Sequence, residues 1–299
     1  MIVVTTPTGQ IGQHVTANLI AAGMDVRVVI RDASKLEELA GQVEVIEGSH
    51  GDPSVIDRAL EGAEALFWLA PPDPGKSLEE AYLVFTRPAA EAIRRNYVKR
   101  VVSVTALGRG TAWQHRAGLV TASIGMDDLL IASGVSFRGL AMPSFMDNLL
   151  RQAISIREEG LFYGPIDPDL KAPVTATQDI GLVAARLLAD SSWTGQGEQP
   201  VLGPEDLSFD DMAEVISDVI GRKVRYQQTT FDSFKAQLVG RGMSESFAQG
   251  YVDMMRAKNE GMDNVAERDA TSGTPTSFRR WCQAALKPAV LGPEKGARP

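Results

Sequence analysis

The chain has 299 residues and a formal net charge of −8, and no stretch of it gathers Lys and Arg into a basic stripe. Contacts with phosphate backbones need clustered cations, so the composition argues against a nucleic-acid partner. The single cysteine, Cys282, excludes an intramolecular disulfide and argues against a metal site built on thiolates. No leader precedes the first strand-like run, and no apolar run approaches the ~20 residues that span a bilayer, so we expect a cytoplasmic protein without a membrane contact.

The N-terminal half of the chain alternates between short β-branched runs and helical patterns. Strands are expected over residues 2–5, 26–30, 43–47, 65–70, 100–105 and 135–141. Helices are expected over residues 12–22, 33–40, 53–60, 78–96 and 124–132. This alternation predicts parallel strands joined by right-handed crossovers, and the continuous apolar runs indicate that helices cover both faces of the sheet. The fold class is therefore α/β, a doubly wound parallel Rossmann sheet.

After Pro143 the pattern becomes mainly helical and predicts a smaller C-terminal lobe. Helical stretches are expected over residues 145–157, 179–188, 209–221, 231–240, 244–259 and 276–285, with a loop over 163–174. We expect residues 1–143 to form the Rossmann domain, completed by about 174–202. Residues 144–173 and 203–290 would form a lobe for a substrate or a partner, and the Gly/Pro-rich residues 291–299 a flexible tail.

The turn between the first strand and the first helix carries the strongest motif, Thr6-Pro7-Thr8-Gly9-Gln10-Ile11-Gly12. A tight turn at this place aims backbone N–H groups and the positive end of the helix dipole at a diphosphate. Gly9 lets the backbone approach the phosphates, Gly12 lets the helix pack close to the strand, and the hydroxyls of Thr6 and Thr8 add donors. Thr6 stands where the glycine fingerprint has its first glycine. The alternative is a tight turn without a ligand, but the strand–turn–helix context favours a dinucleotide.

The end of the second strand bears on which dinucleotide is bound, because it reads Ile30-Arg31-Asp32. An acidic residue here holds the ribose 2′-OH of NAD, whereas an arginine suits the 2′-phosphate of NADP. Arg31 comes first and Lys35 lies one helical turn away, so we favour NADP(H) over NAD(H). The alternative is that Arg31 and Asp32 are ordinary solvated residues at the end of this strand.

Seven segments, spread over nearly the whole chain, resemble the NmrA-like family of atypical short-chain dehydrogenase/reductases. These segments, which follow the glycine turn, are 26–32, 98–108, 133–135, 145–149, 179–181, 202–205 and 221–224. The resemblance implies an NAD(P)-binding Rossmann lobe, and the family includes both NADPH-dependent quinone reductases and redox sensors that bind the dinucleotide without turnover. It also implies the cofactor contacts, which are Thr8, Gly9, Gln10, Ile11 and Gly12 at the phosphates, Arg31 at the adenosine, Ala70 and Pro71 after the fourth strand, and Thr105 near the nicotinamide ribose.

One departure from this family pattern concerns catalysis. The helix over 117–132 contains neither the tyrosine nor the lysine of the Tyr-x-x-x-Lys pair, in which the lysine lowers the phenol pKa. Hydride transfer requires mainly that the protein positions the cofactor and the acceptor. The absence of this pair therefore argues against carbonyl reduction more than against quinone reduction. The catalytic residues therefore stay unknown, with Thr105, His115 and Tyr163 as weak candidates for moving a proton. The three histidines are dispersed and show no metal-ligand spacing, so no metal is expected.

Apolar side chains near the expected site suggest the kind of substrate. Trp113, Met142, Phe145 and Met146, with Tyr163, predict an apolar pocket, although each alone is also typical of an ordinary core. The Met-rich segment 251–262 either covers this cleft or simply packs. We therefore favour an NADPH-dependent oxidoreductase acting on a small apolar acceptor such as a quinone. The alternative is a non-catalytic NADP(H)-sensing regulator that binds a protein partner, and a homodimer is open in either case.

Overall fold

A seven-stranded sheet, in which every neighbouring pair of strands is parallel, forms the centre of the protein. The computed structural model describes residues 1–39 and 41–292. The strand order is β10-β6-β5-β4-β1-β2-β3. The strands are β1 (Ile2–Thr5), β2 (Val26–Ile30), β3 (Glu44–Glu47), β4 (Ala65–Trp68), β5 (Arg100–Ala106), β6 (Ser136–Met142) and β10 (Gln196–Pro200). The predicted doubly wound parallel sheet is confirmed.

The path of the chain across the sheet reverses beside β1. Strands β2 and β3 lie on one side of β1, whereas β4, β5 and β6 lie on the other. In a doubly wound sheet such a switch point leaves a crevice at the carboxyl ends of the strands, where ligands bind. The topology therefore places the phosphate-binding turn, which follows β1, at the edge of this crevice.

Helices cover both faces of the sheet, which explains why β1 and β4 are buried at every position. Helices α1 (Gly12–Ala21) and α6 (Thr177–Ala189) pack together on one face, and α2 (Pro53–Leu60), α3 (Phe85–Arg95) and α4 (Leu119–Ile131) cover the other. A Cβ on Gly181 of α6 would lie 2.4 Å from the Cβ of His14 in α1, so the close approach of these two helices requires the glycine. The short 3₁₀ helix η1 (Ala33–Leu39) follows β2.

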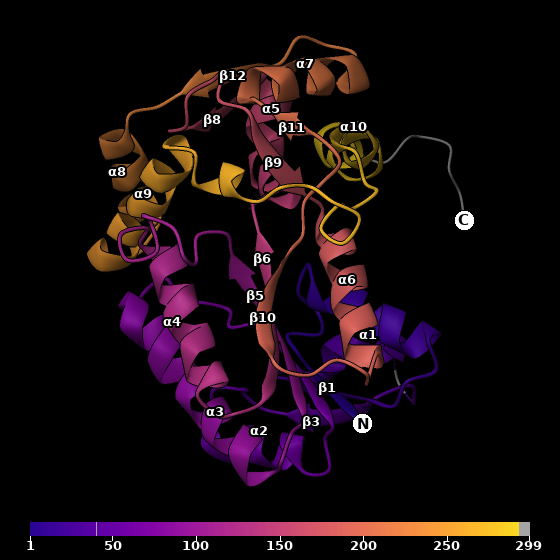
Figure 1. The fold of residues 1–299 in the computed structure, drawn as a ribbon. Coiled ribbons are helices and arrows are strands. Elements are labelled where there is room, and N and C mark those ends of the chain that lie inside the picture. The colour runs from indigo at the N-terminus through magenta and orange to yellow at the C-terminus, as the bar shows by residue number, and fades with distance from the viewer. Residues whose placement is uncertain (40, 293–299) are drawn as a thin grey trace.

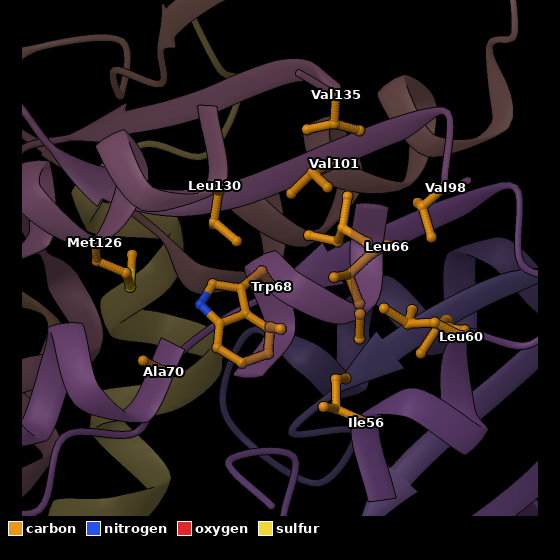
Figure 2. Close-up of a cluster of buried hydrophobic side chains, with 14 of the residues drawn as sticks. Ile56, Leu60, Leu66, Trp68, Ala70, Val98, Val101, Met126, Leu130 and Val135 are labelled. Atoms are coloured by element: carbon orange, nitrogen blue, oxygen red, sulfur yellow. The ribbon is translucent and has the colours of Figure 1, made fainter. Parts of the chain in front are cut away.

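The core under α2, α3 and α4 is built around Trp68 at the end of β4 (Figure 2). The indole is fully buried and packs in one cluster with side chains such as Ile56 of α2 and Met126 of α4. Burial of a side chain of this size stabilises the fold by about 2–3 kcal/mol. This core fixes α4 against β5, and α4 later forms one wall of the functional site.

The helix predicted over 78–96 begins in an unexpected form. It opens as the π-helix η2 (Glu79–Val84) and becomes α-helical only at α3. Pro88 has no N–H to donate to the carbonyl of Val84, so one α-helical hydrogen bond is missing at this junction. Single-turn π-helices occur frequently at functional sites, and this one carries Tyr82, which is buried.

The second lobe lies beyond the carboxyl ends of the sheet strands (Figure 1). Its helical elements are η3 (Met146–Gln152), α5 (Ala153–Glu159), α7 (Phe209–Ile220), α8 (Phe231–Gly240), α9 (Glu245–Asn259), η4 (Met262–Val265), α10 (Phe278–Trp281), η5 (Cys282–Leu286) and α11 (Lys287–Leu291). The helix predicted over 276–285 is thus divided, with a π-helix between two short α-helices, and its inner face buries Cys282.

The loop predicted over 163–174 is wrong in part. It contains the end of β8 (Leu161–Gly164) and all but the last residue of β9 (Ala172–Thr175). Strand β8 pairs with β12 (Arg225–Gln228), and β9 pairs with β7 (Ser144–Phe145) and β11 (Asp206–Leu207). These partners lie far away in the chain, so local periodicity carries little sign of the pairing.

Two expectations concern the ends of this arrangement. Residues 174–202 supply α6 and β10, and β10 adds the seventh strand beside β6. The tail predicted over 291–299 lies outside the described residues from position 293 onward. Within residues 1–39 and 41–292, no helix is both long and apolar enough to cross a bilayer.

Candidate functional site

A cavity of about 700 Å³ opens at the switch point of the sheet and is lined by both lobes. The Rossmann side contributes the turn after β1, the ends of β2, β4 and β5, and α4. The second lobe contributes residues just after β6, part of η3 and one face of α9. The cavity therefore joins the predicted phosphate site to the lobe that was expected to hold a substrate.

The turn after β1 is shaped as a diphosphate cradle. Thr6 adopts φ +53°, a conformation that favours glycine and explains why the fingerprint has one there. Gly9 donates its N–H to the Thr6 carbonyl at 2.9 Å, and a Cβ on Gly12 would lie 2.0 Å from the same oxygen. The full motif lines the cavity, namely Thr6, Pro7, Thr8, Gly9, Gln10, Ile11 and Gly12.

Two features of this turn fit an anionic ligand. The Thr6 hydroxyl is buried and has no hydrogen-bond partner within the described chain. No side chain caps the N-terminus of α1 and no acidic residue lies in its first turn, so the positive end of the helix dipole is available to an anion. The residues present therefore fit the diphosphate of a dinucleotide.

Arg31 and Asp32, which follow β2, have different surroundings in the structure. Arg31 lines the cavity and has no ion pair or hydrogen bond among the described residues. Asp32 instead accepts hydrogen bonds from the hydroxyl and the N–H of Ser34 at 2.6 and 3.1 Å, which hold its pKa below the ordinary value. The ammonium of Lys35 lies 3.9 Å from the Asp32 carboxylate, and Lys35 is outside the cavity lining, contrary to the role expected for it.

His50 lies next to Arg31 in the lining of this cavity and of a smaller one of about 160 Å³. Its Nε2 lies 3.1 Å from the Leu69 carbonyl oxygen, and its ring packs edge-on against Trp68 and Phe85. Burial lowers the pKa of His50 to about 4, so the ring is neutral near pH 7. Ala70 and Pro71, which follow β4, lie in the same lining, as expected.

The end of β5 brings hydroxyl groups to the cavity. Thr105 and Ser123 both line it, and their hydroxyl oxygens lie 3.4 Å apart. Met142 and Phe145, predicted for the apolar pocket, also line it because β6 runs beside β5 with Ala106 opposite Met142. Strands β5 and β6 lie on the other side of β1 from β2, so these residues line the side of the cavity away from Arg31.

Besides Lys35, four further predicted site residues lie outside the cavity lining. The indole N–H of Trp113 donates to Glu260 at 2.8 Å on the surface, and His115 is exposed beside Gln114. Met146 is 1% exposed because it packs into the core of the second lobe. The Tyr163 hydroxyl donates to the Glu159 carboxylate at 2.5 Å and does not reach the cavity. The predictions that these four side chains line the cavity are therefore wrong, because the structure places each of them elsewhere.

Two tyrosines that were not predicted for the site also line the cavity. Tyr82 comes from η2 and Tyr251 from α9. Burial raises the pKa of the Tyr82 phenol, so this group stays protonated, and the nearby Tyr251 adds to the effect. A signal for the wall on α9 was present in the sequence, because its cavity residues follow helical spacing at Phe247, Tyr251, Met254, Met255 and Lys258. The Met-rich segment does cover the cleft.

Comparison with protein families identifies the family of the chain. A family profile described as NAD(P)H-binding matches residues 7–190, and one described as the NmrA-like family matches residues 121–279. The chain belongs to the NmrA-like family. This NmrA-like protein is 32% identical to NAD(P)H azoreductase from Xenophilus azovorans, and the match covers 85% of this chain and 86% of the azoreductase.

Solved structures share the fold at low sequence identity. Triphenylmethane reductase from Citrobacter sp., complexed with NADP(H), matches with a TM-score of 0.80 at 20% identity over 95% of this chain and 100% of that one. An NADPH-dependent quinone oxidoreductase from Escherichia coli matches with 0.75 at 22% over 94% and 98%. NmrA, a negative transcriptional regulator in complex with NADP, matches with 0.73 at 13% over 98% of both chains.

These matches confirm the expected NmrA-like membership and NAD(P)H binding, and they support the oxidoreductase class. The resemblance noted from the segments of the sequence is therefore correct.

Proposed function

We propose that this protein is an NADPH-dependent oxidoreductase that reduces a small, apolar, conjugated acceptor such as a quinone. The observation that carries the proposal is the composition of the 700 Å³ cavity. It combines a diphosphate turn with a wall of apolar and aromatic side chains, which are Tyr82, Met126, Met142, Phe145, Met243, Phe247, Tyr251, Met254 and Met255. Ligand sites of this kind are apolar with a few polar groups that set orientation.

The preference for NADPH rests on Arg31 and Asp32. Arg31 has no protein partner in the described chain and lies at the cavity, so its guanidinium is free for a 2′-phosphate. Asp32 is held by Ser34 and does not line the cavity, so it does not grip a ribose 2′-OH. NADP-bound neighbours in the same fold support the same preference.

The class of acceptor is supported by the relatives. Their names describe reduction of azo compounds, of a triphenylmethane dye and of a quinone, all of which are conjugated. The cavity of this chain offers an apolar surface for such a ring system, and Thr105 supplies a hydroxyl in the same cavity. The bound nicotinamide would supply the hydride, while the protein orients both partners and excludes water with α9.

Turnover separates this proposal from the regulatory alternative. We would measure thermal unfolding with NADPH and with NADH, and then NADPH oxidation with a naphthoquinone and with an azo dye. NADPH should raise the melting temperature more than NADH, by mass action, and at least one acceptor should be reduced catalytically. A nucleotide-dependent stabilisation with no turnover would favour the non-catalytic regulatory alternative instead. Failure of both nucleotides to stabilise the protein at millimolar concentration would remove the cofactor proposal. A protein partner, a homodimer and a cytoplasmic location stay predictions.

A further inference from the structure

A carboxylic acid is buried directly behind the cavity. Asp127 of α4 is 0% exposed, and the Ser103 hydroxyl donates to its Oδ1 at 2.7 Å. Its other oxygen, Oδ2, is buried without a hydrogen-bond partner in the described part of the chain. An unpaired buried carboxylate is costly, so burial favours the protonated acid, whose proton can then be donated.

Two hydroxyl groups lie between this acid and the cavity. Ser123 stands one helical turn before Asp127 on the same face of α4, and its hydroxyl donates to the Val120 carbonyl at 2.9 Å. The Ser123 oxygen lies 3.4 Å from the Thr105 hydroxyl oxygen, a long contact in which either group can donate. Thr105 and Ser123 line the cavity, whereas Asp127 does not.

Gly139 of β6 has no side chain, and this leaves room for the side chains of Asp127 and Thr105 to lie next to it. A Cβ there would lie 3.3 Å from Thr105 Cγ2 and 3.4 Å from Asp127 Oδ2. The Thr105 hydroxyl is near enough to the carboxyl to lower its pKa. Asp127 and Thr105 therefore lie side by side next to Gly139, and of the two only Thr105 lines the cavity.

The charged groups around Asp127 act in opposite directions. Burial raises its pKa most, the hydroxyls of Ser103 and Thr105 lower it, Glu198 of β10 raises it, and Arg109 lowers it; the result is a pKa of about 7. Arg109 is itself held by Glu198 at 2.6 Å and by the exposed Asp128 at 2.7 Å. Asp127 can thus lose and regain a proton near neutral pH.

We propose that Asp127 supplies, through the Thr105 hydroxyl, the proton that accompanies hydride reduction of the acceptor. This inference rests on the proposed reductase function. Hydride transfer gives the acceptor one hydrogen and two electrons and leaves it an anion. The anion takes the Thr105 hydroxyl proton as the Asp127 proton moves to the Thr105 oxygen, which leaves Asp127 ionised. Solvent returns one proton to Asp127 before the next turnover, so the acceptor gains two electrons and two hydrogens in all.

In this scheme Thr105 is the catalytic residue and Asp127 is a positioning residue that acts through it. Ser123 and Asp127 have the i, i+4 spacing of the missing Tyr-x-x-x-Lys pair on the helix predicted to carry it. The chain thus has a route for a proton although it lacks that phenol.

The first test is the pH dependence of kcat with a quinone acceptor. Wild-type kcat should fall as pH rises through about 7, because only protonated Asp127 donates. Asp127→Asn should lower kcat about 10- to 100-fold at about pH 6 and lose this inflection, in the range typical of acid catalysis. The KM for the quinone and the Kd for NADPH should change less than about 2-fold, because Asp127 touches neither ligand.

Two further variants give the sign of the effect. Ser103→Ala removes a hydrogen bond that lowers the pKa, so its inflection should move to higher pH. Glu198→Gln removes a charge that raises the pKa and frees Arg109, so its inflection should move to lower pH. Unmoved inflections in both variants would assign the titration to another group and overturn the proposal.

The second test needs no turnover. Infrared difference spectra of the protein without nucleotide should show a protonated carboxyl band that is lost near pH 7 and is absent in Asp127→Asn. An ionised Asp127 at about pH 6 would overturn the relay. If the wild type is active and Asp127→Asn has the same rate and pH profile, the relay is overturned but the proposed reductase function is not. A wild type that reduces no acceptor would overturn the proposed function, and the relay with it.

Discussion

Gly118, just before α4, touches Gly250 of α9 backbone to backbone: a Cβ on Gly118 would lie only 1.9 Å from the Gly250 carbonyl oxygen. Gly118 also has φ +53°, a conformation that other residues rarely adopt. This contact holds the second lobe against the Rossmann lobe at the cavity, as the proximity of α9 and α4 shows (Figure 1). The apolar wall on α9 therefore depends on two residues without side chains.

Gly118→Ala should displace α9 from α4. We expect a loss of stability of about 2–4 kcal/mol and a higher KM for the acceptor, since both the clash and the backbone strain act. The matched control is Gly110→Ala, because Gly110 has φ +75° but a Cβ on it would meet no atom within 4 Å. The control should lose only the ~1–2 kcal/mol of backbone strain. Equal losses in thermal unfolding for the two variants would show that the glycine contact contributes nothing.

Arg31→Ala should separate the two dinucleotides. Loss of a guanidinium contact to a 2′-phosphate should weaken NADPH binding about 10- to 100-fold and NADH binding less than about 3-fold. Lys35→Ala is the control, because its ammonium lies beside Asp32 and outside the cavity lining. Isothermal titration of both nucleotides measures the effect. Equal losses for NADPH and NADH would instead indicate that Arg31 stacks on the adenine.

Tyr82→Phe should affect catalysis, whereas Tyr163→Phe should not. The Tyr82 phenol lines the cavity and stays protonated, so its loss removes a donor to the acceptor and should reduce kcat/KM about 2- to 10-fold. The Tyr163 hydroxyl is bound to Glu159 away from the cavity, so that variant should stay within about 2-fold of wild type. Steady-state kinetics decide the matter, and a large loss in Tyr163→Phe would contradict the position described for it.

Asp127 should also make stability depend on pH. Its folded pKa is raised from 3.8 to about 7, so its contribution is complete below the unfolded pKa and is lost as pH rises through the folded one. Between about pH 5.5 and pH 8, wild type should lose on the order of 2 kcal/mol relative to Asp127→Asn. Urea unfolding of the two proteins at both pH values measures this difference. A constant difference would mean that Asp127 does not titrate in this range.

Local sequence determined the parts of the site that are contiguous in the chain. The turn from Thr6 to Gly12 and the strand end at Arg31 were predicted because a strand–turn–helix pattern encodes its own backbone conformation, and the structure places both at the cavity. The alternation of strands and helices likewise determined the parallel sheet, since parallel strands need crossovers of this length.

Tertiary structure decided which side chains meet in the cavity. Tyr82, Tyr251 and Met126 come from segments far apart in the chain, and only the packing of η2, α9 and α4 brings them to one place. Met146 and Tyr163 looked equally suitable in sequence, but core packing and a bond to Glu159 turn them away. Periodicity specifies which face of an element is apolar, but the partner of that face depends on long-range packing, which is a property of the whole chain.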